Sequence, residues 1–272
     1  MTGPGNSRLR RVGILGCGFI GAALYDHLAG PEGAASGLAP AFVWARRPDQ
    51  LRHVAAAHRL TDVADAGRHA PDLVVEAAHP DLTLAHGRAL LGLCDYMPLS
   101  VSALADDAVT AGLREVAAAA GTRLLLPVGA LVGGQALAAR RDMWEAVTIT
   151  FRKNPANIDF ASTTIDPATI TGPTTIFDGP VRGIARLFPR NVNTMLTCGL
   201  ATVGLDRCRG VLVADPALDI AIAEVEARGR DGSILRTEKR QPVVGVSGTE
   251  MVASLLRSVR LGMGCLDAVD IV

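Results

Sequence analysis

Short apolar runs alternate with longer Ala- and Leu-rich segments in the first half of the chain. Apolar runs of this length are typical of strands buried on both faces, and their alternation with helices predicts a parallel sheet covered on both sides. The pattern therefore indicates an α/β fold with a Rossmann-like, doubly wound sheet. Helices are expected at 19–29, 82–92 and 106–120, and six strands at 12–15, 41–45, 59–61 (weak), 72–78, 95–100 and 122–128.

The pattern changes after residue 128, where runs of alternating apolar and polar residues appear. Such alternation is typical of strands with one buried and one solvated face, so we expect an antiparallel sheet with one central helix. Strands are expected at 145–154, 174–179 and 209–214, and the helix at 184–203. We predict two domains, a first of residues 1–128 and a second, α+β domain of residues 129–272.

Residues 219–240 resemble two strands closed by Asp231-Gly232, a dipeptide that favours a tight hairpin. The last amphipathic segment, 249–261, follows Ser247 as a possible N-cap. We expect this helix to pack back on the first domain.

Charge and composition limit the possible partners. The 272 residues carry 27 basic and 27 acidic side chains with no long run of like charge, which argues against nucleic acid as a partner. No apolar stretch reaches the roughly 18 to 20 residues that span a bilayer, and the first residues lack a hydrophobic signal core. We expect a soluble, cytoplasmic protein that binds a small molecule and no membrane. The five cysteines show no metal-ligand spacing, so we expect no metal site and no disulfides.

Three glycines, Gly16, Gly18 and Gly21, lie between the first predicted strand and the first predicted helix. In a dinucleotide-binding unit the first glycine allows a tight turn, the second lets the diphosphate approach, and the third lets helix and strand pack closely. The N–H groups at the start of the helix, including Phe19 and Ile20, would then face the phosphates. The alternative is a turn that binds no ligand.

The choice between NAD and NADP depends on the end of the second strand. An acid there would bond the ribose of NAD, but the chain has Ala45 followed by Arg46 and Arg47. Arg46 can meet the 2′-phosphate of NADP, which tilts the expectation toward NADP. Two solvated arginines are an equally good interpretation.

Ligands of a doubly wound sheet lie outside the carboxyl ends of its strands, which here are followed by Ala78, His79 and Ser100. His79 is a candidate acid/base, although a histidine at this position can simply cap the next helix. Glu76 lies within an apolar strand and needs a hydrogen-bonding partner there. In the second domain Arg190 and Asn191 begin a predicted helix and can clamp a carboxylate, and Asn191 alone can be only an N-cap.

Several stretches together resemble the L-aspartate dehydrogenase family, especially its animal branch of aspartate dehydrogenase domain-containing proteins. They are "GILGCGFIG", "PDLVVEAAHP", "SVSALAD", "PVGALVGG", "GPVRGIARLFPRNVNTM" and "VLVADPALD". The resemblance implies oxidation of L-aspartate to iminoaspartate with NAD or NADP, followed by hydrolysis to oxaloacetate and ammonia. It also implies a homodimer built on an open sheet, and contacts of Ala130 and Asn193 with the cofactor near its nicotinamide.

One departure from the family stands out. The resemblance implies that active members carry an "NxH" motif after "ADP", whose histidine is the catalytic acid/base. This chain has Ala221 at the asparagine position and Ala223 at the histidine position. Two hypotheses follow. Either His79 replaces the lost imidazole while Arg190 or Lys153 holds a substrate carboxylate, or the chain binds a dinucleotide with little catalysis, as a sensor or scaffold.

Overall fold

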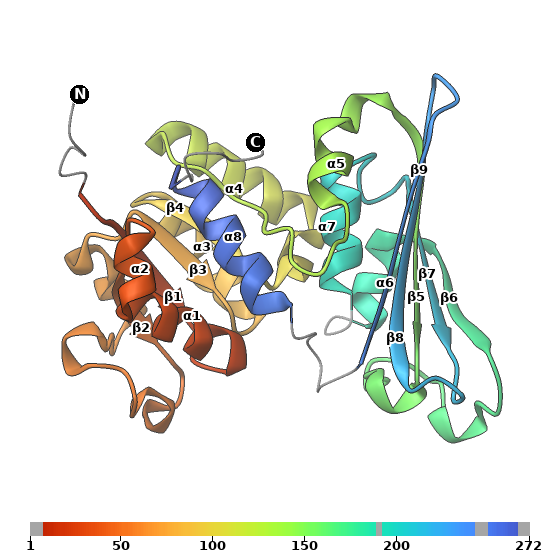
Figure 1. Cartoon of the computed structure of the whole chain (residues 1–272), viewed down its shortest axis with the longest axis horizontal. Helices are drawn as coiled ribbons and strands as arrows, with labels where there is room; N and C mark the ends of the chain where they lie inside the picture. Colours follow the sequence, from red (N-terminus) through yellow and green to blue (C-terminus); the bar gives the residue numbers. More distant parts are fainter. Residues whose placement is uncertain (1–7, 189–191, 243–249, 266–272) are drawn as a thin grey trace. The chain divides into compact units, whose positions relative to one another are not determined.

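The computed structural model describes residues 8–188, 192–242 and 250–265, and the chain forms two compact units (Figure 1). Unit 1 comprises Met1–Pro127 with Val252–Val272, and unit 2 comprises Val128–Met251. The final helix thus belongs to unit 1 although it follows unit 2 in the chain.

Unit 1 is built on a parallel sheet in the order β2-β1-β3-β4. Every residue of β3 is buried, as the unbroken apolar run of the sequence predicts. The doubly wound parallel sheet is thereby confirmed. Its strands are β1 (Arg10–Leu15), β2 (Leu38–Trp44), β3 (Leu73–Glu76) and β4 (Asp95–Pro98).

Helices cover both faces of this sheet (Figure 1). One face packs a core that includes Leu24 of α1, Val75 of β3 and Val259 of α8. On the other face the Thr83 hydroxyl of α3 lies 2.8 Å from the Tyr96 hydroxyl of β4. The predicted helices are present as α1 (Phe19–Ala29), α3 (Pro80–Leu91), α4 (Asp107–Ala120) and α8 (Met251–Gly262), and a short α2 (Pro31–Ala35) follows α1. Short 3-10 turns occupy Pro48–Leu51, Ala56–His58, Val63–His69 and Val101–Ala105.

The prediction of six strands is wrong at both edges of the sheet. Arg59 and Leu124 each form a single parallel bridge, to Val43 and Tyr96, instead of a strand. The segment after Leu124 soon reaches Pro127, which has no N–H to continue a ladder. Arg59 follows the 3-10 turn Ala56–His58, so only Leu60 donates to β2, at the Val43 carbonyl. The hydrogen-bonded sheet therefore has four strands.

Unit 2 contains a five-stranded sheet in the order β6-β7-β5-β8-β9. The expectation of a purely antiparallel sheet is wrong, because β5 and β7 run parallel and only the other pairs are antiparallel. The chain between β5 and β7 is long enough for such a crossover. The strands are β5 (Trp144–Lys153), β6 (Thr174–Pro180), β7 (Cys208–Ala214), β8 (Ile220–Gly229) and β9 (Ile234–Pro242).

Three helices accompany this sheet, not one: α5 (Gly134–Ala139), α6 (Val181–Leu187) and α7 (Asn193–Ala201). The predicted helix at 184–203 is broken after Leu187, since a residue that precedes proline avoids the helical region and Phe188 precedes Pro189. Short 3-10 turns occupy Arg141–Met143, Pro155–Asn157 and Pro167–Thr169.

The β8–β9 hairpin closes through three residues, Arg230 to Gly232, with Gly232 in the left-handed region at φ +83°. Gly229 donates to the Ser233 carbonyl at 2.8 Å, which fixes the register of the two strands. The predicted hairpin is confirmed, and its register pairs Ala223 with Lys239.

No described helix has the length and apolar character needed to cross a membrane. Four of the five free cysteines are buried, and Cys265 is half-buried. Within the described ranges no three His, Cys, Asp or Glu side chains cluster to hold a metal ion. The possible N-cap Ser247 lies outside the described residues.

Candidate functional site

The loop between β1 and α1 needs two of its glycines for folding. Gly16 has φ +106°, which side chains rarely permit, and its N–H donates to the Trp44 carbonyl at 2.7 Å. A Cβ at Gly21 would lie 2.0 Å from the Gly16 carbonyl oxygen, so only glycine allows the turn to close on the helix. These two residues position the start of α1 at the carboxyl end of β1.

The middle glycine has no such structural requirement. A Cβ at Gly18 would meet nothing within 4 Å of the described protein, and no described side chain caps the first turn of α1. That turn also lacks acidic residues, and Phe19 beside it is 69% exposed. Open space in front of uncapped N–H groups suits a diphosphate, which the helix N-terminus attracts. The residues present therefore fit a dinucleotide.

Glu76 ties two loops to this region. It is completely buried, and it accepts hydrogen bonds from the Ala78 N–H at 2.7 Å and from the Ser100 N–H and hydroxyl at 3.1 and 3.0 Å. Burial raises the pKa of the Glu76 carboxyl, and the bonds from Ala78 and Ser100 oppose that rise. Glu76 therefore has the hydrogen-bonding partners that its place in an apolar strand requires. A Cβ on Gly16 would lie 2.7 Å from the Ala78 Cβ, so the three loops meet.

Arg46 and Arg47 follow β2, whose last residue bonds the glycine loop. Both side chains are exposed, and neither forms an ion pair with a described carboxylate. They are therefore available for a phosphate.

His79 caps α3. Its Nδ1 accepts from the Asp81 N–H at 3.3 Å and lies 3.1 Å from the Asp81 carboxylate, while 53% of its side chain is exposed. The capping role considered for this residue is therefore present in the structure. The predicted cofactor residues of unit 1, Gly16, Gly18, Phe19, Ile20, Gly21, Ala78 and Ser100, lie together with it at the carboxyl edge of the sheet.

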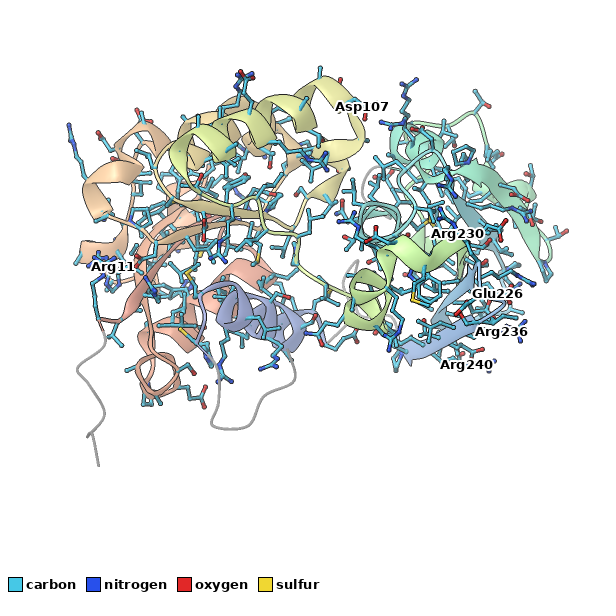
Figure 2. All side chains as sticks on the ribbon, turned by 90° about the horizontal axis from the view of Figure 1, so that it is seen from above. Arg11, Asp107, Glu226, Arg230, Arg236 and Arg240 are labelled. Atoms are coloured by element: carbon cyan, nitrogen blue, oxygen red, sulfur yellow. The ribbon has the colours of Figure 1, made fainter. Side chains whose placement is uncertain are left out.

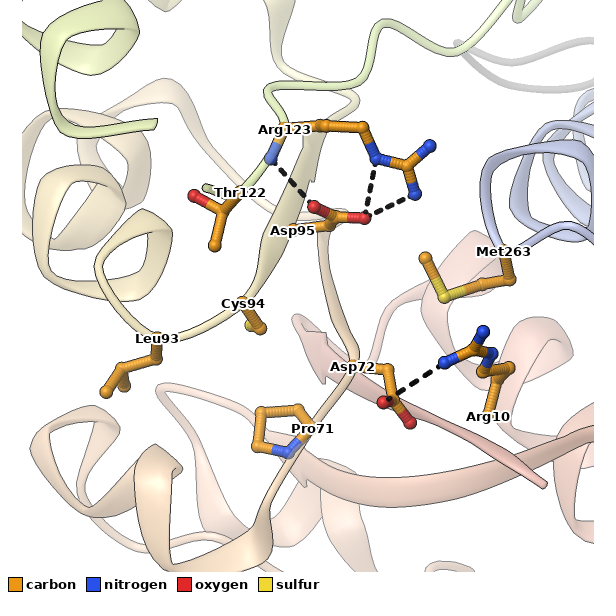
Figure 3. A pocket seen from close by; sticks show the side chains of 9 residues that line it. All are labelled: Arg10, Pro71, Asp72, Leu93, Cys94, Asp95, Thr122, Arg123 and Met263. Carbon is orange, nitrogen blue, oxygen red and sulfur yellow. Dashed lines mark hydrogen bonds and ion pairs between the residues drawn. The ribbon is translucent and has the colours of Figure 1, made fainter. Parts of the chain in front are cut away.

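A hollow in unit 1 lies at the opposite, amino edge of the sheet (Figure 3). Its charges are already paired: Arg123 binds the Asp95 carboxylate at 2.6 Å, and the Arg10 guanidinium lies 3.8 Å from the Asp72 carboxylate. Nucleotides bind doubly wound sheets at the carboxyl edge, so we interpret this hollow as a structural clasp.

In unit 2 the carboxyl end of β5 carries Lys153. Phe151 and Lys153 lie on one face of the strand, where the ammonium nitrogen stands 5.1 Å from the centroid of the Phe151 ring. Phe151 pairs with Ala223 of β8, so Lys153 shares its face with Ala223, the position at which the resemblance implies a histidine. Val147 and Ile149 of the same face are buried, and a Cβ on Gly210 beside Ile149 would meet Val181 of α6.

Two further side chains on this face were missed by the sequence analysis. Lys239 of β9 pairs with Ala223, forms an ion pair with Glu250, and lies 3.5 Å from the Ala130 carbonyl. Gln241 pairs with Ala221, and its buried Oε1 has no hydrogen-bond partner among the described residues. The number of residues between the hairpin turn and these two side chains could have placed them on this face. That inference requires the register of the hairpin to be known.

The remaining predicted residues of unit 2 are partly described. Ala130 lies in the loop that Lys239 contacts, and the half-buried Asn193 begins α7 with its carbonyl accepting from Thr197 at 3.1 Å. Arg190 and Asn191 lie outside the described residues.

The other face of the unit 2 sheet is polar, and it includes Glu226 and Arg236, which Figure 2 labels. Glu226 of β8 binds Arg236 of β9 at 2.6 Å, and Arg152 of β5 binds Glu224 at 3.1 Å. A shallow hollow runs over this face, lined by Thr150, Arg152, Glu224 and Arg236 among others.

The geometry of both units agrees with known proteins. Residues 16–127 match the family model described as homoserine dehydrogenase, NAD binding domain, and residues 135–259 match the model described as aspartate dehydrogenase, C-terminal. The chain is similar to an aspartate dehydrogenase domain-containing protein of Xenopus tropicalis, with 34% identity over 93% of this chain and 94% of that protein. It is also 34% identical to L-aspartate dehydrogenase 1 of Bordetella pertussis, over 94% of this chain and 97% of that protein.

A solved structure gives the same result. The crystal structure of aspartate dehydrogenase from Thermotoga maritima aligns with a TM-score of 0.72 and 25% identity, over 96% of this chain and 99% of that one. The NAD-binding model covers the glycine loop and Glu76 with its partners Ala78 and Ser100, and the C-terminal model covers Lys153 and Lys239. The chain belongs to the aspartate dehydrogenase family.

Proposed function

We propose that the protein oxidises the amino group of L-aspartate, or of a closely related amino dicarboxylate, with NAD or NADP as oxidant. The observation that carries the proposal is the open, uncapped helix start at Gly18, in a chain that belongs to this family. Gly16 and Gly21 shape the turn, and the N–H groups of Phe19 and Ile20 bind the diphosphate. Ala78 and Ser100, held by Glu76, line the same edge.

A nicotinamide dinucleotide held by the glycine loop would supply the acceptor for the hydride, with its two electrons, that leaves Cα of the substrate. The substrate ammonium must first lose one proton to a protein group, so that its nitrogen lone pair can form the C=N bond as the hydride leaves. Water then adds to the imine carbon and the C–N bond breaks, which yields oxaloacetate and ammonium; the proton held by the protein is released.

Within this proposal unit 2 recognises the substrate. Arg190, Asn191 and Lys153 are the candidates for its carboxylates, and Ala130 and Asn193 are candidates for contacts near the nicotinamide. His79 is a candidate proton acceptor, because it follows β3 at the cofactor edge.

NADP is the cofactor we propose as preferred. The support is the pair of exposed cations, Arg46 and Arg47, at the strand end where an acid would bond the ribose of NAD.

A second function is favoured by one specific observation, the alanine at position 223. A positioned acid/base contributes about 10² to 10⁴-fold in rate, so its loss without replacement leaves a dinucleotide-binding protein with little catalysis. Such a protein would act as a sensor or scaffold.

We also propose that the chain forms a homodimer through the polar face of the unit 2 sheet. The support is its row of cross-strand charges, including Glu226 and Arg236, which no described helix of unit 2 covers (Figure 2). Light scattering should give twice the chain mass, and a monomer at micromolar concentration would contradict this part.

The deciding experiment measures dinucleotide binding and turnover on the same preparation. Calorimetry with NADPH and NADH tests the glycine loop, and aspartate-dependent formation of NAD(P)H tests the reaction. Binding together with turnover supports the dehydrogenase, whereas binding without turnover of aspartate or glutamate supports the second function. A folded protein that binds neither dinucleotide would contradict both.

A further inference from the structure

The two lysines of the chain lie on one face of one sheet. Of 27 basic residues, only Lys153 and Lys239 are lysines, and the other 25 are arginines. An arginine side chain stays protonated in proteins, whereas a lysine can lose its proton when its surroundings disfavour the charge. The only side chains of this chain that can act as neutral amines therefore occur together, on β5 and β9.

Small side chains on β8 leave room beside them. Ala223 lies between Phe151 and Lys239 in the register of the sheet, and Ala221 pairs with Gln241 in the next row. Both alanines are only half-buried, so this part of the face is accessible. The buried Gln241 Oε1 lacks a described partner and adds an acceptor for a bound N–H group.

Lys239 is a cation with a carboxylate partner. Glu250 forms an ion pair with it, and the Ala130 carbonyl accepts from it at 3.5 Å. The positive charge of Lys239 disfavours a second positive charge on the same face.

Lys153 has no such counter-ion among the described residues. Asp215 donates its N–H to the Lys153 carbonyl at 2.9 Å, but the Asp215 carboxylate accepts from the Ala217 N–H. Arg152 points to the opposite face, where it binds Glu224. Of the helices on this side, α5 and α7 contain no charged residue. Helix α6 carries Arg182, which is paired with Asp206, and Arg186, which is exposed.

Burial and the charge of Lys239 together lower the pKa of Lys153 from the usual 10.5 to about 8. A substantial fraction of Lys153 is then a neutral amine near physiological pH. A nearby cation is a known means of keeping a lysine unprotonated for chemistry.

We propose that Lys153 is the proton acceptor for the substrate amine and that Lys239 is a positioning residue that keeps Lys153 neutral. The inference rests on the proposed dehydrogenase function. Neutral Lys153 takes one proton from the substrate ammonium, whose nitrogen lone pair then forms the C=N bond as the hydride leaves Cα. Lys153 returns that proton to solvent after the imine is hydrolysed.

This assignment differs from the two earlier candidates. His79 is more than half exposed and uses Nδ1 to cap α3, so it is less desolvated than Lys153. A lysine that only binds a carboxylate would need its charge, whereas a proton acceptor must be neutral. The two roles of Lys153 therefore predict opposite results for a permanently charged replacement.

The test compares Lys153→Arg and Lys153→Met with Arg152→Met, which removes a cation from the opposite face of the same strand. We expect Lys153→Arg to lower kcat by about 10² to 10⁴-fold, with KM for aspartate changed less than threefold, and Lys153→Met to lose kcat equally. Arg152→Met should stay within twofold of the wild type. The dissociation constant of NADPH should be the same in all of these proteins.

A second readout needs no turnover. Trace labelling with acetic anhydride at several pH values, followed by mass spectrometry, gives the pKa of each lysine separately because the chain has only two. We expect Lys153 to label with a pKa near 8. Lys239→Met should raise the pKa of Lys153 and move the acidic limb of kcat/KM to higher pH.

The outcomes separate the two proposals. Aspartate turnover by the wild type with kcat retained in Lys153→Arg, or labelling of Lys153 at an ordinary lysine pKa, would overturn the inference alone. A wild type that binds NADPH but forms none from aspartate or glutamate would overturn the proposed function, and the inference with it.

Discussion

The two units present candidate sites of different kinds. In unit 1 the site is made of backbone: Gly16 and Gly21 shape a turn, and Gly18 leaves N–H groups open to a ligand. In unit 2 it is made of side chains from two strands, Lys153 on β5 and Lys239 on β9.

This difference decides how each site can change. A backbone cradle depends on a few adjacent residues, so it survives many substitutions elsewhere and serves many reactions. A side-chain site depends on which residues face one another, and one strand can lose a group while a neighbour supplies another. In unit 2, Ala223 faces Phe151 on one neighbouring strand and Lys239 on the other.

The largest effect is expected at Gly21, where the comparison predicts a loss of folding as well as binding. In Gly21→Ala the added Cβ would lie 2.0 Å from the Gly16 carbonyl oxygen, so helix and strand must separate. We expect a loss of about 3 kcal/mol in the free energy of unfolding, measured by urea denaturation.

Gly18→Ala is the matched control, because a Cβ there meets nothing within 4 Å. Its stability should change by less than about 0.5 kcal/mol, while NADPH should bind about tenfold more weakly. Equal stability losses in the two variants would contradict the separate roles of these glycines.

In unit 2, Ala223→His tests whether the face still accepts an imidazole as the acid/base. Histidine titrates near neutrality, so the variant should have about tenfold higher kcat/KM than the wild type at pH 6, where Lys153 is protonated. Initial rates with aspartate between pH 5.5 and 9 measure this. Ala201→His, at the end of α7, is the control, and an equal gain there would show that position 223 has no special role.

Glu76 distinguishes the units in another way, because its raised pKa makes unit 1 sensitive to pH. The folded protein binds the Glu76 proton more tightly than the unfolded chain does. The resulting stabilisation is fully present below the ordinary glutamate pKa of 4.5 and is lost as pH rises through the folded pKa.

Glu76→Gln has no such titration. The stability of the wild type relative to this variant should therefore fall from pH 4.5 to 8, measured by urea denaturation at each pH. A difference that is constant with pH would show that the pKa of Glu76 is the same in the folded and unfolded chains.

The smallest effect is expected at Arg46, which affects only the choice of cofactor. Arg46→Ala should weaken NADPH binding by about three- to tenfold and leave NADH binding unchanged, because only NADPH carries the 2′-phosphate. Arg68→Ala, an exposed arginine paired with Asp65, is the control. Equal weakening of both dinucleotides would indicate that Arg46 does not read the phosphate.

Much of unit 1 could be predicted because its signals are local. Helix α1 begins and ends at the predicted residues, and the buried run of β3 identifies a central strand. The two predicted edge strands were wrong because whether a segment forms a strand or a single bridge, as at Arg59 and Leu124, depends on how many of its residues run alongside the neighbouring strand. In unit 2 the helix break at Phe188 was readable from Pro189, whereas the parallel pairing of β5 with β7 was not.

The sequence alone determined the glycine turn, the helix that follows it, and the presence of a hairpin at Asp231-Gly232. Only the tertiary structure decided which face Lys239 occupies. A two-residue Asp-Gly turn would pair Lys239 with Glu224 on the polar face, whereas the three-residue turn pairs it with Ala223 beside Lys153. Side chains alternate along a strand, so one residue of register moves a charge from one face to the other, and no local pattern fixes that choice.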